Sequence, residues 1–161
     1  MSEPYTETLE GEIIQRRAPG AWHELLCLRL HRSVHAGVAN FAGTRLLPAR
    51  SAVRVSDNTT VRPDLALITV STGKLWLAAE VISSDDHRTD TVIKKQLYEE
   101  LKLPRLWIID PRYDNIEVYH SSEYGLILKS MLAGREVLAE KLLPEFQLNV
   151  LDLFHAPQPQ S

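Results

Sequence analysis

Two carboxylates stand in the most apolar part of the chain, where burial makes an unpaired charge costly. Asp64 opens the run "DLALITV" and Glu80 lies inside the run "KLWLAAEVI". Both runs are short and almost continuously apolar, which is typical of strands buried on both faces, and the "STGK" between them favours a hairpin. Adjacent strands would bring the two acids together. The repulsion is relieved by protonation, by an ion pair with a base or by a bound cation.

A divalent metal ion is the solution that has chemical consequences. Mg²⁺ prefers hard oxygen ligands, usually one or two carboxylates with water and phosphate, and a bound ion activates water and polarises a phosphodiester. Pro63-Asp64 at a strand start, followed after a hairpin by a strand glutamate, is the acidic half of the PD-(D/E)xK nuclease pattern. A structural alternative stays open, in which Asp64 is a strand-end residue and Glu80 pairs with Lys74 or Arg62.

The lysine of that pattern is displaced in this chain. Ile82 occupies the usual position, two residues after Glu80. The following segment "DDHRTDTVIKKQLYEEL" is expected to be a helix, and Asp90, Lys94 and Tyr98 lie on one face of it because they are spaced by four residues. We expect Lys94 to reach back to the acids, where its ammonium positions water or offsets charge in the transition state. The alternative is a solvated ion pair between Asp90 and Lys94.

The rest of that helix is expected to pack through an apolar face and to leave Lys95 in solvent. The residues of the expected apolar face are Val92, Ile93, Gln96, Leu97 and Leu101.

Strand and helix patterns alternate along the chain. We expect a short strand at 10–17, a helix from 22 to about 35, a strand pair within 45–60 that turns at "SDN", a buried strand at 103–111, a hairpin at 115–132, and a last strand with a short helix at 134–154. The predicted class is α/β, an α+β arrangement with a central mixed sheet flanked by helices. Residues 1–155 are expected to form one domain and 156–161 a disordered tail.

Composition is that of a globular protein with no strong charge bias. The 161 residues carry a formal net charge of -3, so charge alone does not indicate nucleic acid, although a local patch or metal ions can bind phosphates. The single cysteine, Cys27, lies in an apolar run and is expected to be a core residue in a cytoplasmic protein. No apolar run approaches the ~20 residues of a membrane span, so no membrane contact is expected.

The order of motifs resembles the Uma-two family of restriction-endonuclease-like proteins over nearly the whole chain. "LEGEIIQRRAPGAWHELL" is similar to the family's Gly-Glu strand, proline turn and helix that starts with histidine. "VRPDLALI" is similar to its Pro-Asp strand. "AAEVISSDDHRTDTVIKKQLYEELKLPRLWIIDP" resembles its Glu-Val-x-Ser strand, Asp-x-x-x-Lys-x-x-x-Tyr helix and Trp strand, and "LLPEFQL" its closing segment.

The resemblance implies a restriction-endonuclease-like fold and a site that uses Mg²⁺ or Mn²⁺. Asp64 and Glu80 are then the metal-binding acids and Lys94 the catalytic lysine. The supporting candidates are Glu12 and His23 at family positions near the site, Ser83 and Tyr98 as hydrogen-bond partners that orient the acids, and Asp90 on the helix.

Two functions from different classes follow. The first is a Mg²⁺-dependent endonuclease that hydrolyses phosphodiester bonds of nucleic acid, with DNA as the expected substrate. The alternative is a non-catalytic module that keeps the nuclease fold and binds nucleic acid or protein. A homodimer is expected because one small site cuts one strand and a duplex needs two.

Overall fold

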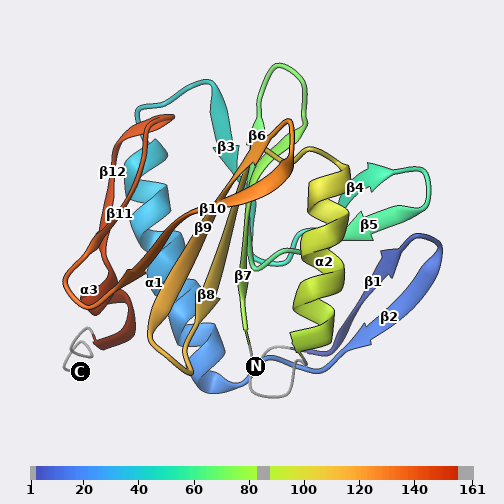
Figure 1. Cartoon of the computed structure of the whole chain (residues 1–161), viewed down its shortest axis with the longest axis horizontal. Coiled ribbons are helices and arrows are strands. Elements are labelled where there is room, and N and C mark those ends of the chain that lie inside the picture. The colour runs from blue at the N-terminus through green and yellow to red at the C-terminus, as the bar shows by residue number, and fades with distance from the viewer. Residues whose placement is uncertain (1–2, 83–87, 156–161) are drawn as a thin grey trace.

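A six-stranded mixed sheet forms the centre of the molecule, in the order β10-β9-β8-β7-β6-β3 (Figure 1). This computed structural model describes residues 3–82 and 88–155, with 88–90 described by their backbone alone. β7 and β8 are parallel, and every other neighbouring pair of this sheet is antiparallel. Its strands are β3 (Thr44–Leu46), β6 (Leu65–Thr69), β7 (Leu75–Val81), β8 (Arg105–Asp110), β9 (Asn115–Ser122) and β10 (Gly125–Ala133).

Different elements cover the two faces of the sheet (Figure 1). One face carries α1 (Ala21–Val38), the two-stranded sheet of β11 (Val137–Glu140) and β12 (Leu143–Asn149), and α3 (Val150–His155). The other side carries α2 (Arg88–Glu100), which connects β7 to β8, and a four-stranded sheet in the order β2-β1-β5-β4. The strands of this second sheet are β1 (Tyr5–Leu9), β2 (Glu12–Arg16), β4 (Val53–Ser56) and β5 (Thr59–Val61). None of the described helices is long and apolar enough to cross a membrane.

Side-chain alternation divides the central strands between two apolar cores. On β8, Trp107 and Ile109 join the core under α1, whereas Leu106 and Ile108 join the core under α2. The prediction of a central hairpin buried on both faces is confirmed, because β6 and β7 pair antiparallel through buried residues. On β7 the same alternation sends Ala78 toward the α2 side, and Glu80 follows two residues later.

Both ends of the chain contain one strand more than the sequence pattern indicated. The strand expected at 10–17 is β2, but a further strand, β1, precedes it, and the two form a hairpin whose turn at Glu10 and Gly11 has φ angles of 52° and 84°. The segment 134–154 was expected to hold one strand, but β11 and β12 pair with each other before α3. Short strands interrupted by charged residues give a weak alternation signal, which explains both differences.

The expected apolar face of α2 is wrong in its first turns. Val92 and Ile93 are 56% and 44% exposed, whereas Lys94 is only 7% exposed and Tyr98 is fully buried. The helix therefore packs through a face that contains a lysine. Apolar periodicity alone cannot find such a face, because the partner of the lysine lies on other elements.

A tight contact between α1 and β12 yields a stability prediction. A Cβ added at Gly37 would lie 2.7 Å from the Cβ and 3.0 Å from the Cα of Phe146. We expect Gly37→Ala to lower the free energy of unfolding by about 1–2 kcal/mol, because overpacking outweighs the helix preference for alanine. Urea unfolding measures the change.

The matched control for this substitution is Gly43→Ala. A Cβ there would meet only Phe41 Cε1, at an ordinary 3.8 Å, so its effect should stay within about 0.5 kcal/mol. A Gly37→Ala protein as stable as the wild type would contradict the close packing of α1 on β12.

Candidate active site

The ammonium of Lys94 lies between two carboxylates that come from different sheets. Its Nζ is 2.8 Å from Glu7 Oε2 on β1 and 2.5 Å from Glu80 Oε1 on β7. Burial alone would lower the pKa of Lys94, but Glu80 and Glu7 outweigh it and raise that pKa above its ordinary value. Lys94 is therefore a charged ammonium that is almost fully removed from solvent.

Glu7 is the functional candidate that the sequence analysis missed. Its other oxygen accepts a hydrogen bond from Arg16 Nε at 2.8 Å, and the backbone N–H of Arg62 donates to Oε2 at 2.7 Å. Burial raises the pKa of Glu7, but Lys94, the Arg62 N–H and Arg16 together bring it below its ordinary value. The signal was present in "YTETL", where the inward positions of a strand are Tyr5, Glu7 and Leu9.

Glu12, the acid that the family resemblance implied on this hairpin, is not brought to the cluster. It is exposed at the start of β2, where it pairs with Leu9 at the turn end of the hairpin. The hairpin therefore offers the cluster a different acid from the one expected.

Asp64 is held by donors from α1, β7 and the turn that contains Arg50. Its Oδ2 accepts from the backbone N–H of Val81 at 2.8 Å and lies 3.4 Å from His23 Nε2, and its Oδ1 lies 3.2 Å from Arg50 Nη1. Burial raises the pKa of Asp64, but the hydrogen bond and charge of His23, the Val81 N–H and Lys94 outweigh it and lower the pKa. The group is a buried, ionised carboxylate in a fixed orientation.

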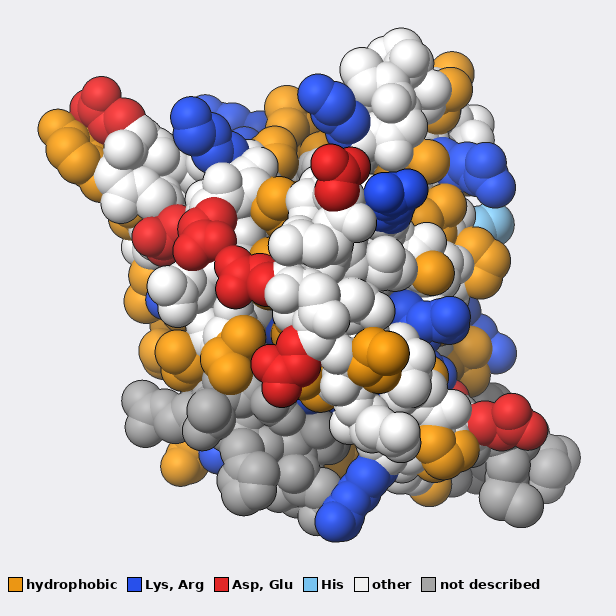
Figure 2. Space-filling model, turned by 90° about the vertical axis from the view of Figure 1, so that its right-hand side faces the viewer, with side chains coloured by type: hydrophobic (Ala, Val, Ile, Leu, Met, Phe, Trp, Pro, Cys, Tyr) orange, Lys and Arg blue, Asp and Glu red, His pale blue; other side chains and the backbone are white. Residues whose placement is uncertain are grey.

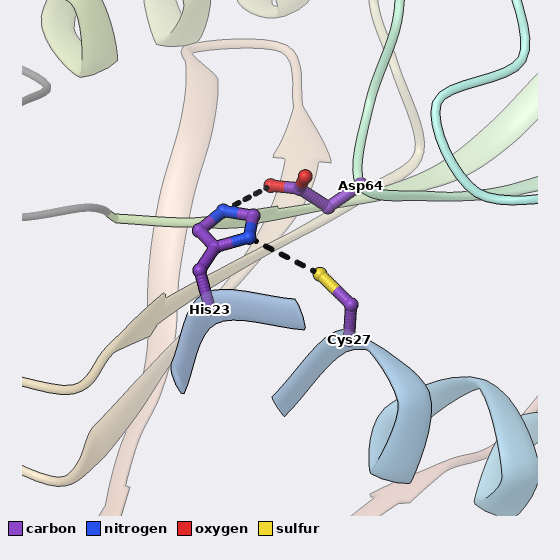
Figure 3. Close-up of side chains that lie close together, drawn as sticks. All are labelled: His23, Cys27 and Asp64. Atoms are coloured by element: carbon purple, nitrogen blue, oxygen red, sulfur yellow. Dashed lines mark hydrogen bonds and ion pairs between the residues drawn. The ribbon is translucent and has the colours of Figure 1, made fainter. Parts of the chain in front are cut away.

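His23 and Cys27 extend this support along the first turns of α1 (Figure 3). The two ring nitrogens of His23 face different partners: Nε2 lies 3.1 Å from the Val81 carbonyl oxygen and 3.4 Å from Asp64 Oδ2, and Nδ1 lies 3.6 Å from Cys27 Sγ. One ligand atom from each of the three residues lies within 4.8 Å of the others, a spacing that could hold a metal ion. Arg50 already supplies a positive charge there, since its Nη1 lies 3.9 Å from Cys27 Sγ and contacts Asp64.

We therefore interpret His23, Cys27 and Arg50 as a hydrogen-bonded support for Asp64. Burial raises the pKa of the Cys27 thiol. The thiol thus stays protonated, and Cys27 belongs to the core under α1, as expected from the sequence.

Glu80 is the acid with the least compensation. Its Oε1 accepts from the Tyr98 hydroxyl at 2.7 Å and from Lys94, while Oε2 has no hydrogen bond with any described residue. Burial raises the pKa of Glu80, Lys94 opposes that rise, and Asp64 and Glu7 add to it, so that the pKa reaches about 7. The charged form of Glu80 is thus disfavoured mainly by burial, and a bound cation would stabilise it.

A cavity of about 30 Å³ opens beside these side chains, and its lining includes Glu7, Asp64, Glu80, Lys94 and Tyr98. Roughly 10–15 Å³ suffices for one water molecule, so the cavity has room for a water or an ion. Asp64 and the open Oε2 of Glu80 are hard oxygen ligands of the kind that Mg²⁺ and Mn²⁺ prefer. The donor set therefore fits the expected metal.

Four of the eight predicted site residues line this cavity, and His23 joins them through its contact with Asp64. The structure brings together Asp64, Glu80, Lys94, Tyr98 and His23, whereas Ser83 and the side chain of Asp90 lie outside the described residues. Lys95 was expected to face solvent. It is half-buried instead, with its Nζ 4.3 Å from the centre of the Tyr119 ring.

Solved structures resemble this chain to different degrees. A crystal structure described as "a putative nuclease belonging to DUF820 from Anabaena variabilis ATCC 29413" matches with a TM-score of 0.79 and 18% sequence identity, over 95% of this chain and 91% of that one. The match confirms the predicted restriction-endonuclease-like fold. A second match, to the cryo-EM structure of a DrdV–DNA complex, has a TM-score of 0.36 and 11% identity over 83% of this chain and 14% of that one, which is too distant to carry an argument.

No curated protein matches the chain. The family model described as "Uma2: Putative restriction endonuclease" matches residues 2–151. With nearly its whole length matched, the chain belongs to the Uma2 family, as its motifs predicted.

Proposed function

We propose that this protein is a divalent-metal-dependent nuclease that hydrolyses phosphodiester bonds at the cluster of Asp64, Glu80 and Lys94. The observation that carries the proposal is the charged, buried ammonium of Lys94 beside Glu80, whose Oε2 has no hydrogen bond among the described residues and which lines a cavity together with Asp64. A network of purely structural ion pairs would instead compensate every charge. The proposed substrate is nucleic acid, and DNA is preferred over RNA as the first candidate. The proposed form of the protein is a cytoplasmic homodimer.

The residues divide the work of such a site by position. Asp64 and Glu80 would hold Mg²⁺ or Mn²⁺, which supplies polarisation of the phosphodiester and a lowered pKa of bound water. Lys94 Nζ lies against Glu80, where it can donate a hydrogen bond to the attacking water or to a phosphate oxygen. Tyr98 holds Glu80, and His23 holds Asp64.

Glu7 acts in this proposal through Lys94. A lysine on a helix has a long, flexible side chain, and the carboxylate of Glu7 gives its ammonium a second buried contact besides Glu80. Because Arg16 and the Arg62 N–H hold Glu7 in turn, the N-terminal hairpin positions the lysine that the sheet lacks at Ile82.

Substitution of the three central residues tests the assignment. We expect Asp64→Asn and Glu80→Gln to abolish Mg²⁺ or Mn²⁺ binding in calorimetric titrations, because each removes a ligand charge. Lys94→Met should retain metal binding but reduce cleavage of single- and double-stranded DNA by about 10²–10³-fold, because it removes a donor to the transition state. Circular dichroism checks that each variant is folded.

Glu12→Gln is the control, since Glu12 is an exposed acid of the hairpin outside the cavity lining. It should bind metal and cleave DNA like the wild type. Metal binding that survives the loss of both Asp64 and Glu80 charges would overturn the site. Metal binding that depends on them, without cleavage of DNA or RNA, would instead favour the non-catalytic module.

A second prediction concerns the charge of Glu7. Its pKa is lower in the folded protein than the ordinary value of 4.5, so its ionisation stabilises the fold above about pH 4.5 and that contribution is lost as the pH falls through the folded-state pKa. We expect Glu7→Gln to lower the free energy of unfolding by about 3 kcal/mol near pH 7, because it leaves buried cations undercompensated.

Urea unfolding from pH 3 to pH 8 measures this difference. The gap between wild type and Glu7→Gln should narrow as the pH falls below about 4.5, and Glu12→Gln should stay within about 0.5 kcal/mol of the wild type throughout. A gap that is the same at pH 3 and pH 7 would contradict an ionised Glu7.

A further inference from the structure

A groove of about 440 Å³ lies beside the acid cavity, between α2 and the β8–β9 region of the sheet. Groove and cavity share four lining residues, which are Ile82, Thr91, Lys95 and Ile108. The cavity and the groove are therefore adjacent, and the shared residues line both. If the scissile phosphate of a nucleic acid lies at the acids, the nucleotide next to that phosphate lies at this groove.

Lys95 brings a positive charge to the junction of cavity and groove. It follows Lys94 on α2, and successive helical residues point about 100° apart, so Lys94 faces the acids while Lys95 lies across the ring of Tyr119. Lys95 forms no ion pair with any carboxylate in the described parts of the chain. Its charge therefore remains available for a phosphate.

Tyr113 supplies an aromatic face elsewhere along the groove. Its side chain is 70% exposed, in the turn between β8 and β9, and the Arg112 guanidinium carbon lies 5.4 Å from the centre of its ring. Arg112 is itself fixed by Asp110, with Nε and Nη2 at 3.0 and 2.9 Å from the two carboxylate oxygens. An exposed ring beside a fixed guanidinium is a surface on which a nucleobase stacks.

Of the two described acids that line the groove, one is neutralised by an ion pair and the other accepts a hydrogen bond. Asp110 is neutralised by Arg112, and Glu117 accepts a hydrogen bond from the Tyr119 hydroxyl. The face over α2 and the N-terminal hairpins mixes Lys and Arg with Asp and Glu among its described residues (Figure 2). Phosphate binding near the site therefore depends on individually placed cations such as Lys95, since the described residues of that face form no broad basic surface.

We propose that this groove binds the nucleotide next to the scissile phosphate, in a single-stranded or unpaired segment of nucleic acid. Lys95 contacts the neighbouring backbone phosphate, and Tyr113 stacks on the base. An unpaired segment is required because bases inside a duplex are already stacked and present no free face. The inference rests on the proposed function, since the acid cavity defines which phosphate is cut.

Fluorescence anisotropy with short labelled oligonucleotides, single-stranded and as the matching duplex, tests the groove in EDTA, where no cleavage occurs. Tyr113→Ala should weaken single-strand binding by roughly 5- to 100-fold, and Tyr113→Phe, which keeps the ring, should bind like the wild type. Lys95→Gln should weaken binding and reduce the slope of log affinity against log salt by about 0.7, as expected for one lost phosphate contact. Lys95→Arg should restore both.

Two controls match these variants in type and differ in place. Tyr124 is an exposed tyrosine at the opposite end of β9, and Lys141 is an exposed lysine between β11 and β12, across the sheet from α2. Tyr124→Ala and Lys141→Gln should bind single strands like the wild type. Equal loss in the controls and the groove variants would overturn the groove as a specific subsite.

The remaining outcomes separate this inference from the proposed function. Groove variants that bind and cleave like the wild type, while Asp64→Asn abolishes cleavage, would overturn the groove and leave the nuclease intact. Single-strand binding that needs Tyr113 and Lys95, without cleavage in any metal, would support the groove and overturn the nuclease. A wild-type protein that binds no single strand, or binds duplex equally well, would overturn the groove.

Discussion

The ammonium of Lys94 bridges carboxylates from two separate sheets, Glu7 on β1 and Glu80 on β7. Removal of an ion from water costs several kcal/mol, so each of these buried charges is tolerated only while the others are in place. The contact explains why α2 exposes Val92 and Ile93. The helix turns its lysine inward because Glu7 and Glu80 are already buried there, and a buried ion pair that loses one partner costs about 3–5 kcal/mol.

Charge compensation is uneven across the cluster, because Asp64 has more stabilising partners than Glu80. Asp64 is oriented by His23, Arg50 and the Val81 N–H and has a lowered pKa, whereas Glu80 has a pKa of about 7. The rise at Glu80 from 4.5 corresponds to about 3 kcal/mol against its charged form. A bound cation would remove that penalty. The acid with the largest penalty is also the one with an open oxygen, which is the arrangement expected where function sets the charge pattern.

The parts of the site that depend on local periodicity could be predicted from the sequence. Two acids at strand positions on a hairpin, and a lysine four residues before a tyrosine on a helix, are patterns that a short window contains, and the structure brings Asp64, Glu80, Lys94 and Tyr98 to one cavity. Glu7 was missed because its partner Lys94 is 87 residues away. Resemblance pointed to Glu12 instead, but the β1–β2 turn carries that residue to the exposed end of the hairpin. Which hairpin acid faces inward depends on a turn position that motif order does not specify.

The displaced lysine changes what α2 does in the molecule. Ile82 is buried in the core under α2 at the position where the nuclease pattern has its lysine, so the strand gains apolar packing and the helix takes over the charge. α2 then carries Lys94 toward the acids and Lys95 toward the groove. Under the proposals above, the element that recognises the neighbouring nucleotide is the same rigid helix that positions the ammonium. A substrate that fills the groove would therefore hold α2 in the position in which Lys94 contacts Glu80, and binding and catalysis would be linked through one helix without any longer path.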